Sequence, residues 1–201
     1  YDAVVQITIG ANFSCCYQNA CAAAQEYENV FVVDSENLST GQGLLVVAAA
    51  KLAEQGLSGA EIAERVRALA PKVEASFLIE CLDYMRKGGR CSAVAALGAN
   101  LLHLKPCIEV RNGKMAVCKK YRGSFEKCIR QYVKERLDGR EDIAPELAFI
   151  THAAADANVV AAAKEEAAQY GSFETVEETQ AGCTVSCHCG PNTLGILFVR
   201  K

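Results

Sequence analysis

The sequence predicts an α/β chain in two parts. The remainder of a parallel α/β domain spans residues 1–72, and an α+β domain spans residues 73–201. The second part is expected to have a mostly antiparallel six-stranded sheet with helices on one side. Three observations support this: a strand–helix–strand order near the start, six strand-like segments after residue 74, and an Asn-Gly hairpin signal between two of them.

The first part begins with two short β-forming segments separated by an alanine-rich segment. Residues 3–9 and 30–33 are rich in valine and isoleucine, and residues 17–27 favour a helix. Two parallel strands joined by a crossover helix fit this order. Because ligands of such sheets bind at the carboxyl ends of the strands, we expect the loops at residues 10–14 and 34–40 on the ligand side.

Two more helices are expected in the first part. One runs from about Thr40 to Gln55, and the next begins at Ser58, with Glu61 three residues later as a capping box. Pro71 ends this second helix.

Strands and helices of the second part follow from its apolar segments and turn residues. Asn112-Gly113 predicts a tight hairpin. Strands are expected at 75–80, 107–111, 114–119, 147–151, 173–178 and 194–199, and helices at 81–86, 92–102, 156–170 and after Ser124.

Composition excludes several classes of function. The chain has 201 residues, 51% of them hydrophobic, and a net charge of −3, so neither disorder nor a nucleic-acid partner is expected. The longest uncharged apolar run, residues 43–50, is too short to span a bilayer.

Eleven cysteines, an odd number mostly within apolar patterns, predict a reducing cytoplasm rather than a disulfide scaffold. The chain begins at Tyr1 almost within a strand, so upstream residues are expected to be missing.

The loop Gly10-Ala11-Asn12-Phe13-Ser14 is the first candidate site. A hydroxyl and free backbone N–H groups just before a helix can bind a carboxylate or a phosphate. The alternative is that Ser14 only caps the helix.

A second candidate is the segment Gly182 to Pro191, which contains Cys183, Cys187, His188 and Cys189. One interpretation is a zinc site, although no second half of such a site is visible and adjacent ligands of an extended segment point in alternating directions. Another is a cysteine nucleophile activated by His188. A third is that His188, in a glycine-proline loop, donates a hydrogen bond to an acidic ligand.

The third candidate is the cationic turn Arg86-Lys87-Gly88-Gly89-Arg90. Paired glycines allow positive φ and close backbone approach, and Arg86 and Arg90 are suited to binding a phosphate. The alternative is solvated charge at a helix end, with a glycine cap.

Further segments accompany these candidate sites along essentially the whole chain. They are Ile7-Thr8-Ile9, Phe13-Ser14, Tyr17-Gln18-Asn19-Ala20, Val33-Asp34-Ser35, Gly41-Gln42-Gly43-Leu44-Leu45-Val46, Leu82-Asp83-Tyr84-Met85 with the cationic turn, Lys105-Pro106, His188-Cys189-Gly190-Pro191 and Leu194-Gly195. Taken together, these segments resemble the DegV family of bacterial fatty-acid-binding proteins.

The resemblance implies a cytoplasmic, non-catalytic carrier that binds a long-chain fatty acid between two domains and presents it to a partner fatty acid kinase for phospholipid synthesis. The carboxylate would lie near Ser14 and His188, and Arg86 and Arg90 would face the kinase or the acyl phosphate. It implies no cofactor and no metal. The partners would be the fatty acid and the catalytic kinase subunit, with peripheral membrane contact during lipid exchange and no nucleic acid.

The chain departs from the family pattern at several positions. A Thr-Ser-rich loop expected upstream is absent from the sequence, Ala11 replaces an expected hydroxyl, and cysteines stand at 15, 16, 187 and 189. Two alternatives therefore stay open: a cysteine-rich metal or redox-linked protein on the same fold, and a degenerate paralogue that binds no ligand.

Overall fold

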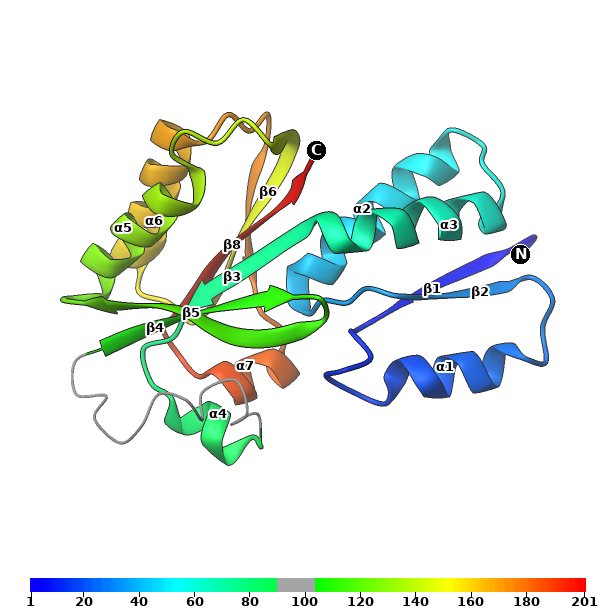
Figure 1. Ribbon diagram of the computed structural model, residues 1–201, viewed down its shortest axis with the longest axis horizontal. Coiled ribbons are helices and arrows are strands. Elements are labelled where there is room, and N and C mark those ends of the chain that lie inside the picture. Colours follow the sequence, from blue (N-terminus) through cyan, green and yellow to red (C-terminus); the bar gives the residue numbers. More distant parts are fainter. Residues whose placement is uncertain (90–103) are drawn as a thin grey trace. The chain divides into compact units, whose positions relative to one another are not determined.

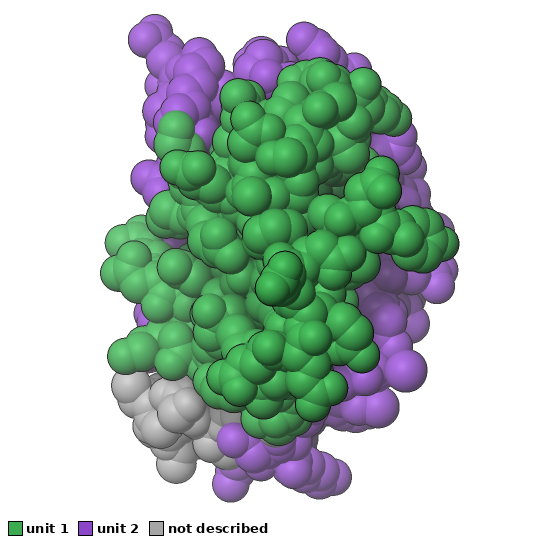
Figure 2. All heavy atoms as spheres, turned by 90° about the vertical axis from the view of Figure 1, so that its right-hand side faces the viewer, with its two compact units in different colours: residues 1–74, 110–114 green, residues 75–109, 115–201 purple. Residues whose placement is uncertain are grey.

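The computed structural model describes residues 1–89 and 104–201 (Figure 1). The chain forms two compact units, which Figure 2 distinguishes by colour. Unit 1 comprises residues 1–74 and 110–114, and unit 2 comprises residues 75–109 and 115–201. The helix expected at 92–102 lies outside the described residues.

Unit 1 is built on a parallel pair of strands, as the sequence predicts. β1 (Val4–Thr8) pairs with β2 (Val30–Asp34), with Val4 opposite Val30 and Thr8 opposite Asp34. α1 (Cys16–Ala24) makes the crossover that parallel pairing requires. Both strands therefore end at the same edge, where the two loops of interest begin.

Two further helices complete unit 1. They are α2 (Ser39–Glu54) and α3 (Gly59–Leu69), followed by the 3₁₀ turn η1 (Ala70–Lys72). The expected capping box is present: the Ser58 hydroxyl accepts from the Glu61 N–H at 3.4 Å, and a Glu61 carboxylate oxygen accepts from the Ser58 N–H at 2.9 Å. Val33, Leu45 and Val66 are fully buried.

Unit 2 contains a sheet of six strands among the described residues, in the order β5-β4-β3-β8-β6-β7. β8 runs antiparallel to β6, whereas β7 runs parallel to it. The strands are β3 (Val73–Leu78), β4 (Leu104–Arg111), β5 (Lys114–Arg122), β6 (Ile143–Ala153), β7 (Val176–Gln180) and β8 (Thr193–Arg200).

The tight turn between β4 and β5 is the one that the sequence predicts. Asn112 and Gly113 have φ values of 51° and 68°, and positive φ at both central residues is typical of a type I′ hairpin turn.

Two long helices, α5 (Phe125–Leu137) and α6 (Ala157–Tyr170), pack side by side over one face of the sheet (Figure 1). They enclose the main core with β3, β4, β6 and β8. A smaller cluster forms where Met85 of the short helix α4 (Asp83–Lys87) meets Ile79 and Ile108. Because Ile108 and the main-core residue Cys107 are neighbours on β4, the two clusters use opposite faces of that strand.

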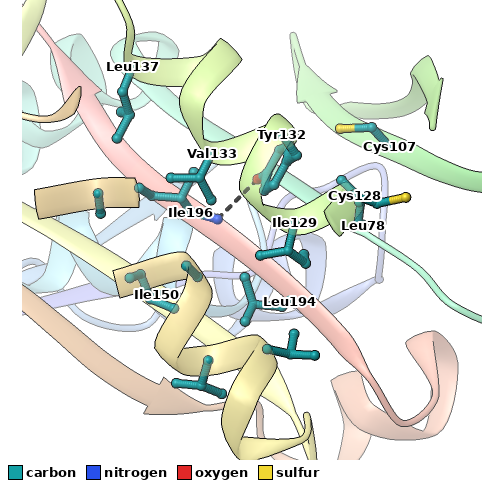
Figure 3. Close-up of a cluster of buried hydrophobic side chains, with 14 of the residues drawn as sticks. Leu78, Cys107, Cys128, Ile129, Tyr132, Val133, Leu137, Ile150, Leu194 and Ile196 are labelled. Carbon is teal, nitrogen blue, oxygen red and sulfur yellow. Dashed lines mark hydrogen bonds between the residues drawn. The ribbon is translucent and has the colours of Figure 1, made fainter. Parts of the chain in front are cut away.

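The Tyr132 hydroxyl ties three elements together inside the main core (Figure 3). It donates to the Ser76 carbonyl oxygen at 2.6 Å and accepts from the Ile196 N–H at 3.0 Å. A side chain of Gly195 would collide with Ser76, since its Cβ would lie 2.4 Å from the Ser76 oxygen. Tyr132 on α5 thus supplies polar contacts to both β3 and β8 from one fully buried side chain.

The segment from Cys183 to Cys189 corrects the sequence interpretation. It forms a helix, α7, where a glycine-proline loop was expected. Gly182 stands at its N-cap, and Gly190, with φ of 79°, ends it.

Within the described parts of the chain, no helix has the length and apolar character needed to span a membrane.

Candidate functional site

The carboxyl ends of β1 and β2 carry two loops that are joined by hydrogen bonds. The Ala11 N–H donates to Asp34 Oδ1 at 3.1 Å, and the Gly10 N–H donates to the Asn37 carbonyl at 2.8 Å. The Glu36 N–H donates to the same Asp34 oxygen at 2.9 Å. Asp34 therefore fixes both loops at the edge where parallel sheets bind ligands.

The loop after β2 has an unusual backbone. Glu36 and Ser39 both have φ of 52°, in the left-handed region that non-glycine residues rarely adopt. Asn37, only 2% exposed, accepts from the Leu38 N–H through its side chain at 3.0 Å. Gly41 makes room for this amide, because a Cβ there would lie 2.1 Å from Asn37 Oδ1. The loop is thus held in one conformation by buried polar contacts.

Ser14 lies at the end of the first loop, in unit 1, and is half-buried. Its hydroxyl accepts from the Cys16 N–H at 3.3 Å and donates to the Cys16 sulfur at 3.0 Å. The N-cap of α1 is Cys15, which makes no capping hydrogen bond through its side chain. Ser14, one position before the N-cap, therefore accepts a hydrogen bond from the first amide of the helix. Its O–H donates only to a weak sulfur acceptor, so it can turn to a stronger oxygen acceptor.

In unit 2, α4 and α7 pack directly against each other. Two glycines make this contact close. A Cβ at Gly88 would lie 2.1 Å from His188 Nδ1, and a Cβ at Gly190 would lie 2.4 Å from Tyr84 Cδ2. His188 therefore packs on the backbone at the end of α4, and Tyr84 packs on the backbone at the end of α7.

The His188 ring is oriented by this contact. Its Nδ1 atom is buried and has no hydrogen-bond partner among the described residues. Because a buried N–H without an acceptor is costly, the tautomer that carries the proton on Nε2 is favoured. That tautomer presents an N–H donor on the side of the ring away from Gly88.

The helical form of α7 also bears on the metal interpretation. Successive residues of a helix point about 100° apart, so Cys187, His188 and Cys189 cannot converge on one ion. Cys183 and Cys187 are exposed, whereas the Cys189 thiol is buried and its pKa is raised by that burial. Over residues 1–89 and 104–201, no group of three or more His, Cys, Asp or Glu side chains is arranged to hold a metal.

The cationic turn is described in part. Arg86 and Lys87 are exposed in the last turn of α4, and Gly89 has φ of 70°, as paired glycines allow. Arg90 lies outside the described residues. The structure thus brings the turn at Arg86 together with His188, through Gly88, while Ser14 belongs to the other unit.

Reasoning from residue types did not find the contact between Gly88 and His188. The glycine pair indicated a close backbone approach, but about a hundred residues separate Gly88 from its partner. No periodicity or spacing rule connects positions so distant in sequence.

Comparison with known proteins places these features in a family. Residues 1–201 match the family model described as an uncharacterised protein of the DegV family. A DegV domain-containing protein of Clostridium acetobutylicum is 32% identical over 98% of this chain and 70% of its own length. Protein DegV of Bacillus subtilis is 30% identical over all of this chain and 72% of its own length.

Solved structures agree with this match. A fatty-acid-binding DegV family protein from Thermus thermophilus has a TM-score of 0.86 at 28% identity, covering 100% of this chain and 71% of that one. The fatty-acid-binding protein DegV from Bacillus subtilis has a TM-score of 0.79 at 27% identity, and the match covers 100% of this chain and 72% of that one. With its full length matched by the family model and its fold shared with these structures, the chain belongs to the DegV family.

Proposed function

We propose that this chain binds a long-chain fatty acid and acts as a non-catalytic carrier. The observation that carries the proposal is the similarity, over the whole chain, to DegV proteins described as fatty-acid-binding. The tightly fixed loops after β1 and β2 and the glycine-lined contact between α4 and α7 support it, since ligand sites combine a few oriented polar groups with apolar walls.

The proposed carboxylate contacts are Ser14 and His188. A buried carboxylate needs hydrogen-bond donors, because an unpaired buried charge is very costly. His188 offers an Nε2–H whose direction is set by the packing of its Nδ1 edge on Gly88. Ser14 offers an O–H that loses only a weak bond to the Cys16 sulfur when it turns to a carboxylate.

Titration with a long-chain fatty acid tests the role of His188. We expect His188→Ala to weaken binding roughly tenfold, the effect of about 1.4 kcal/mol for a lost hydrogen bond to a charged group. Cys187→Ala is the matched control, since Cys187 is an exposed neighbour on the same helix. Equal affinities of the wild type and His188→Ala would show that His188 does not bind the carboxylate.

We further propose that the carrier presents its ligand to a partner fatty acid kinase, with Arg86 and Arg90 facing the kinase or the acyl phosphate. Arg86 is exposed at the end of α4, two positions before Gly88, which packs on His188. A guanidinium there suits phosphate, which it binds in a bidentate manner.

The kinase step is tested by mixing the lipid-loaded chain with a bacterial fatty acid kinase subunit and ATP, and trapping the acyl phosphate with hydroxylamine. Arg86→Gln should lower the yield severalfold without changing fatty acid affinity. Lys87→Gln, an adjacent exposed cation, is the control and should leave the yield near the wild-type value. Equal yields from the two variants would argue against a role for Arg86.

A further inference from the structure

Two cysteines of unit 2 face each other across the β4–β5 hairpin. Counted outward from the two-residue turn at Asn112-Gly113, Cys107 lies opposite Cys118. The Cys118 thiol donates to the Cys107 carbonyl at 3.4 Å, and the two thiols are themselves in hydrogen-bond contact. Both sulfurs are free.

A guanidinium lies against both sulfurs. Arg136 Nη2 on α5 is 3.0 Å from Cys118 Sγ and 3.7 Å from Cys107 Sγ. The same group pairs with Glu109 at 3.2 Å, which holds it in position. A cation beside a sulfur stabilises the thiolate, the form of cysteine that reacts.

The two thiols differ in environment. Cys118 is exposed on strand β5 at the edge of the sheet, whereas Cys107 is fully buried in the main core (Figure 3). The hydrogen bond with Cys107 and the charge of Arg136 lower the pKa of Cys118 to about 7, although burial and Glu109 oppose this. The pKa of Cys107 is raised, by its hydrogen bond with Cys118 and by burial. One thiol is thus reactive and accessible, and the other is shielded beside it.

We propose that Cys107 and Cys118 form a hydroperoxide-sensitive dithiol, in which the Cys118 sulfur attacks the oxidant and Cys107 resolves the product as a cross-strand disulfide. This site is independent of fatty acid binding.

The chemistry balances in two steps. The Cys118 thiolate attacks one oxygen of the hydroperoxide, an S–O bond forms, the O–O bond breaks, and the leaving oxygen takes a proton to give an alcohol or water. The Cys107 sulfur then attacks the Cys118 sulfenic acid, an S–S bond forms, and the S–O oxygen leaves as water with the Cys107 proton. One hydroperoxide is reduced for each dithiol oxidised, and a dithiol reductant reverses the result.

The backbone allows this bond. Residues directly opposite in an antiparallel pair have Cα atoms about 4.5–5.5 Å apart, within the range that disulfides span. The disulfide would join β5, the strand at the edge of the sheet, covalently to β4.

Peptide mapping of the chain after limited hydrogen peroxide treatment tests the proposal. Trypsin releases Cys118 in the peptide Met115–Lys119 and Cys107 in a peptide that also contains Cys91, so the digest is made on Cys91→Ser. We expect the two peptides linked before reduction and separate after it. In a Cys107→Ser variant, Cys118 should instead accumulate as a sulfenic acid that dimedone traps.

Alkylation rates provide a second, independent measurement. At pH 7 a thiol of pKa about 7 has about fifty times the thiolate of one at the ordinary 9.0, and its lower nucleophilicity reduces the advantage to about fivefold. Iodoacetamide should therefore modify Cys118 about five times faster in the folded chain than in the urea-unfolded chain, where the thiol has its ordinary pKa. Arg136→Gln, with its fold checked by circular dichroism, should reduce this advantage, because the charge of Arg136 is one of the causes that lower the Cys118 pKa. Equal rates at Cys118 in the folded and unfolded chain, or no linked peptide, would overturn the proposal.

Discussion

At the scale of single residues, two adjacent glycines have different tasks. Gly88 has an ordinary φ of −77° but touches the His188 ring, so its lack of a side chain is what makes room for the ring. Gly89 has φ of 70°, and no atom of the described residues lies within 4 Å of an added Cβ, so glycine is required there for its backbone conformation. This separation makes a matched pair of substitutions available.

We predict that Gly88→Ala displaces His188 and weakens fatty acid binding, whereas Gly89→Ala leaves binding nearly unchanged. The first change inserts a methyl group 2.1 Å from His188 Nδ1. The second places alanine in a left-handed conformation, which costs about 1–2 kcal/mol of stability. Isothermal titration with a long-chain fatty acid, beside a thermal melt of each variant, distinguishes the two. Equal loss of binding in both would mean that the turn, rather than the position of His188, matters.

At the scale of elements, most helices and strands lie where residue patterns predict them, because their signals are local. Ser58 and Glu61 correctly predict the start of their helix, and Asn112-Gly113 correctly predicts the turn of its hairpin. α7 was missed because cysteine, threonine, valine and serine have middling helix propensity. Its glycine ends were visible, but the packing against α4 that stabilises it comes from distant residues.

The same limit applies to the candidate site. The sequence pointed to Ser14, Arg86 and His188 by residue type and by resemblance, and the contact that orients His188 emerged only from the structure.

The junction of α5 with β3 and β8 gives a prediction at this scale. Tyr132→Phe should lower the free energy of unfolding by about 2–3 kcal/mol, because it leaves the buried Ile196 N–H and Ser76 carbonyl without this hydroxyl. Denaturant unfolding measures the difference. Tyr170→Phe, a half-buried tyrosine at the end of α6, is the control and should cost far less. A loss below about 0.5 kcal/mol in Tyr132→Phe would show that the bridge contributes little.

At the scale of the whole molecule, buried tyrosines connect stability to alkaline pH. Burial raises the pKa of Tyr132, and burial together with a hydrogen bond to Glu135 raises that of Tyr121. Above the ordinary value of 10.0 the unfolded chain loses these protons while the folded chain keeps them. Stability is therefore full below pH 10 and falls as pH rises further.

The fully buried Tyr132 should contribute a slope that approaches about 1.4 kcal/mol per pH unit as pH rises above 10. Urea unfolding at pH 10 and pH 11 should show a loss of stability in the wild type, and this loss should be smaller by about 1 kcal/mol in Tyr132→Phe. Identical declines in the two proteins would mean that Tyr132 ionises equally easily in the folded chain.

The central proposal is that the chain carries a fatty acid. Identifying the lipid that is bound to the purified chain tests this proposal most directly. The chain is purified without added lipid, extracted with solvent, and the extract is quantified by mass spectrometry against protein concentration. We predict a long-chain fatty acid near one equivalent per chain, and a clear decrease in His188→Ala. A lipid-free extract, together with no binding when fatty acid is added back, would contradict the account.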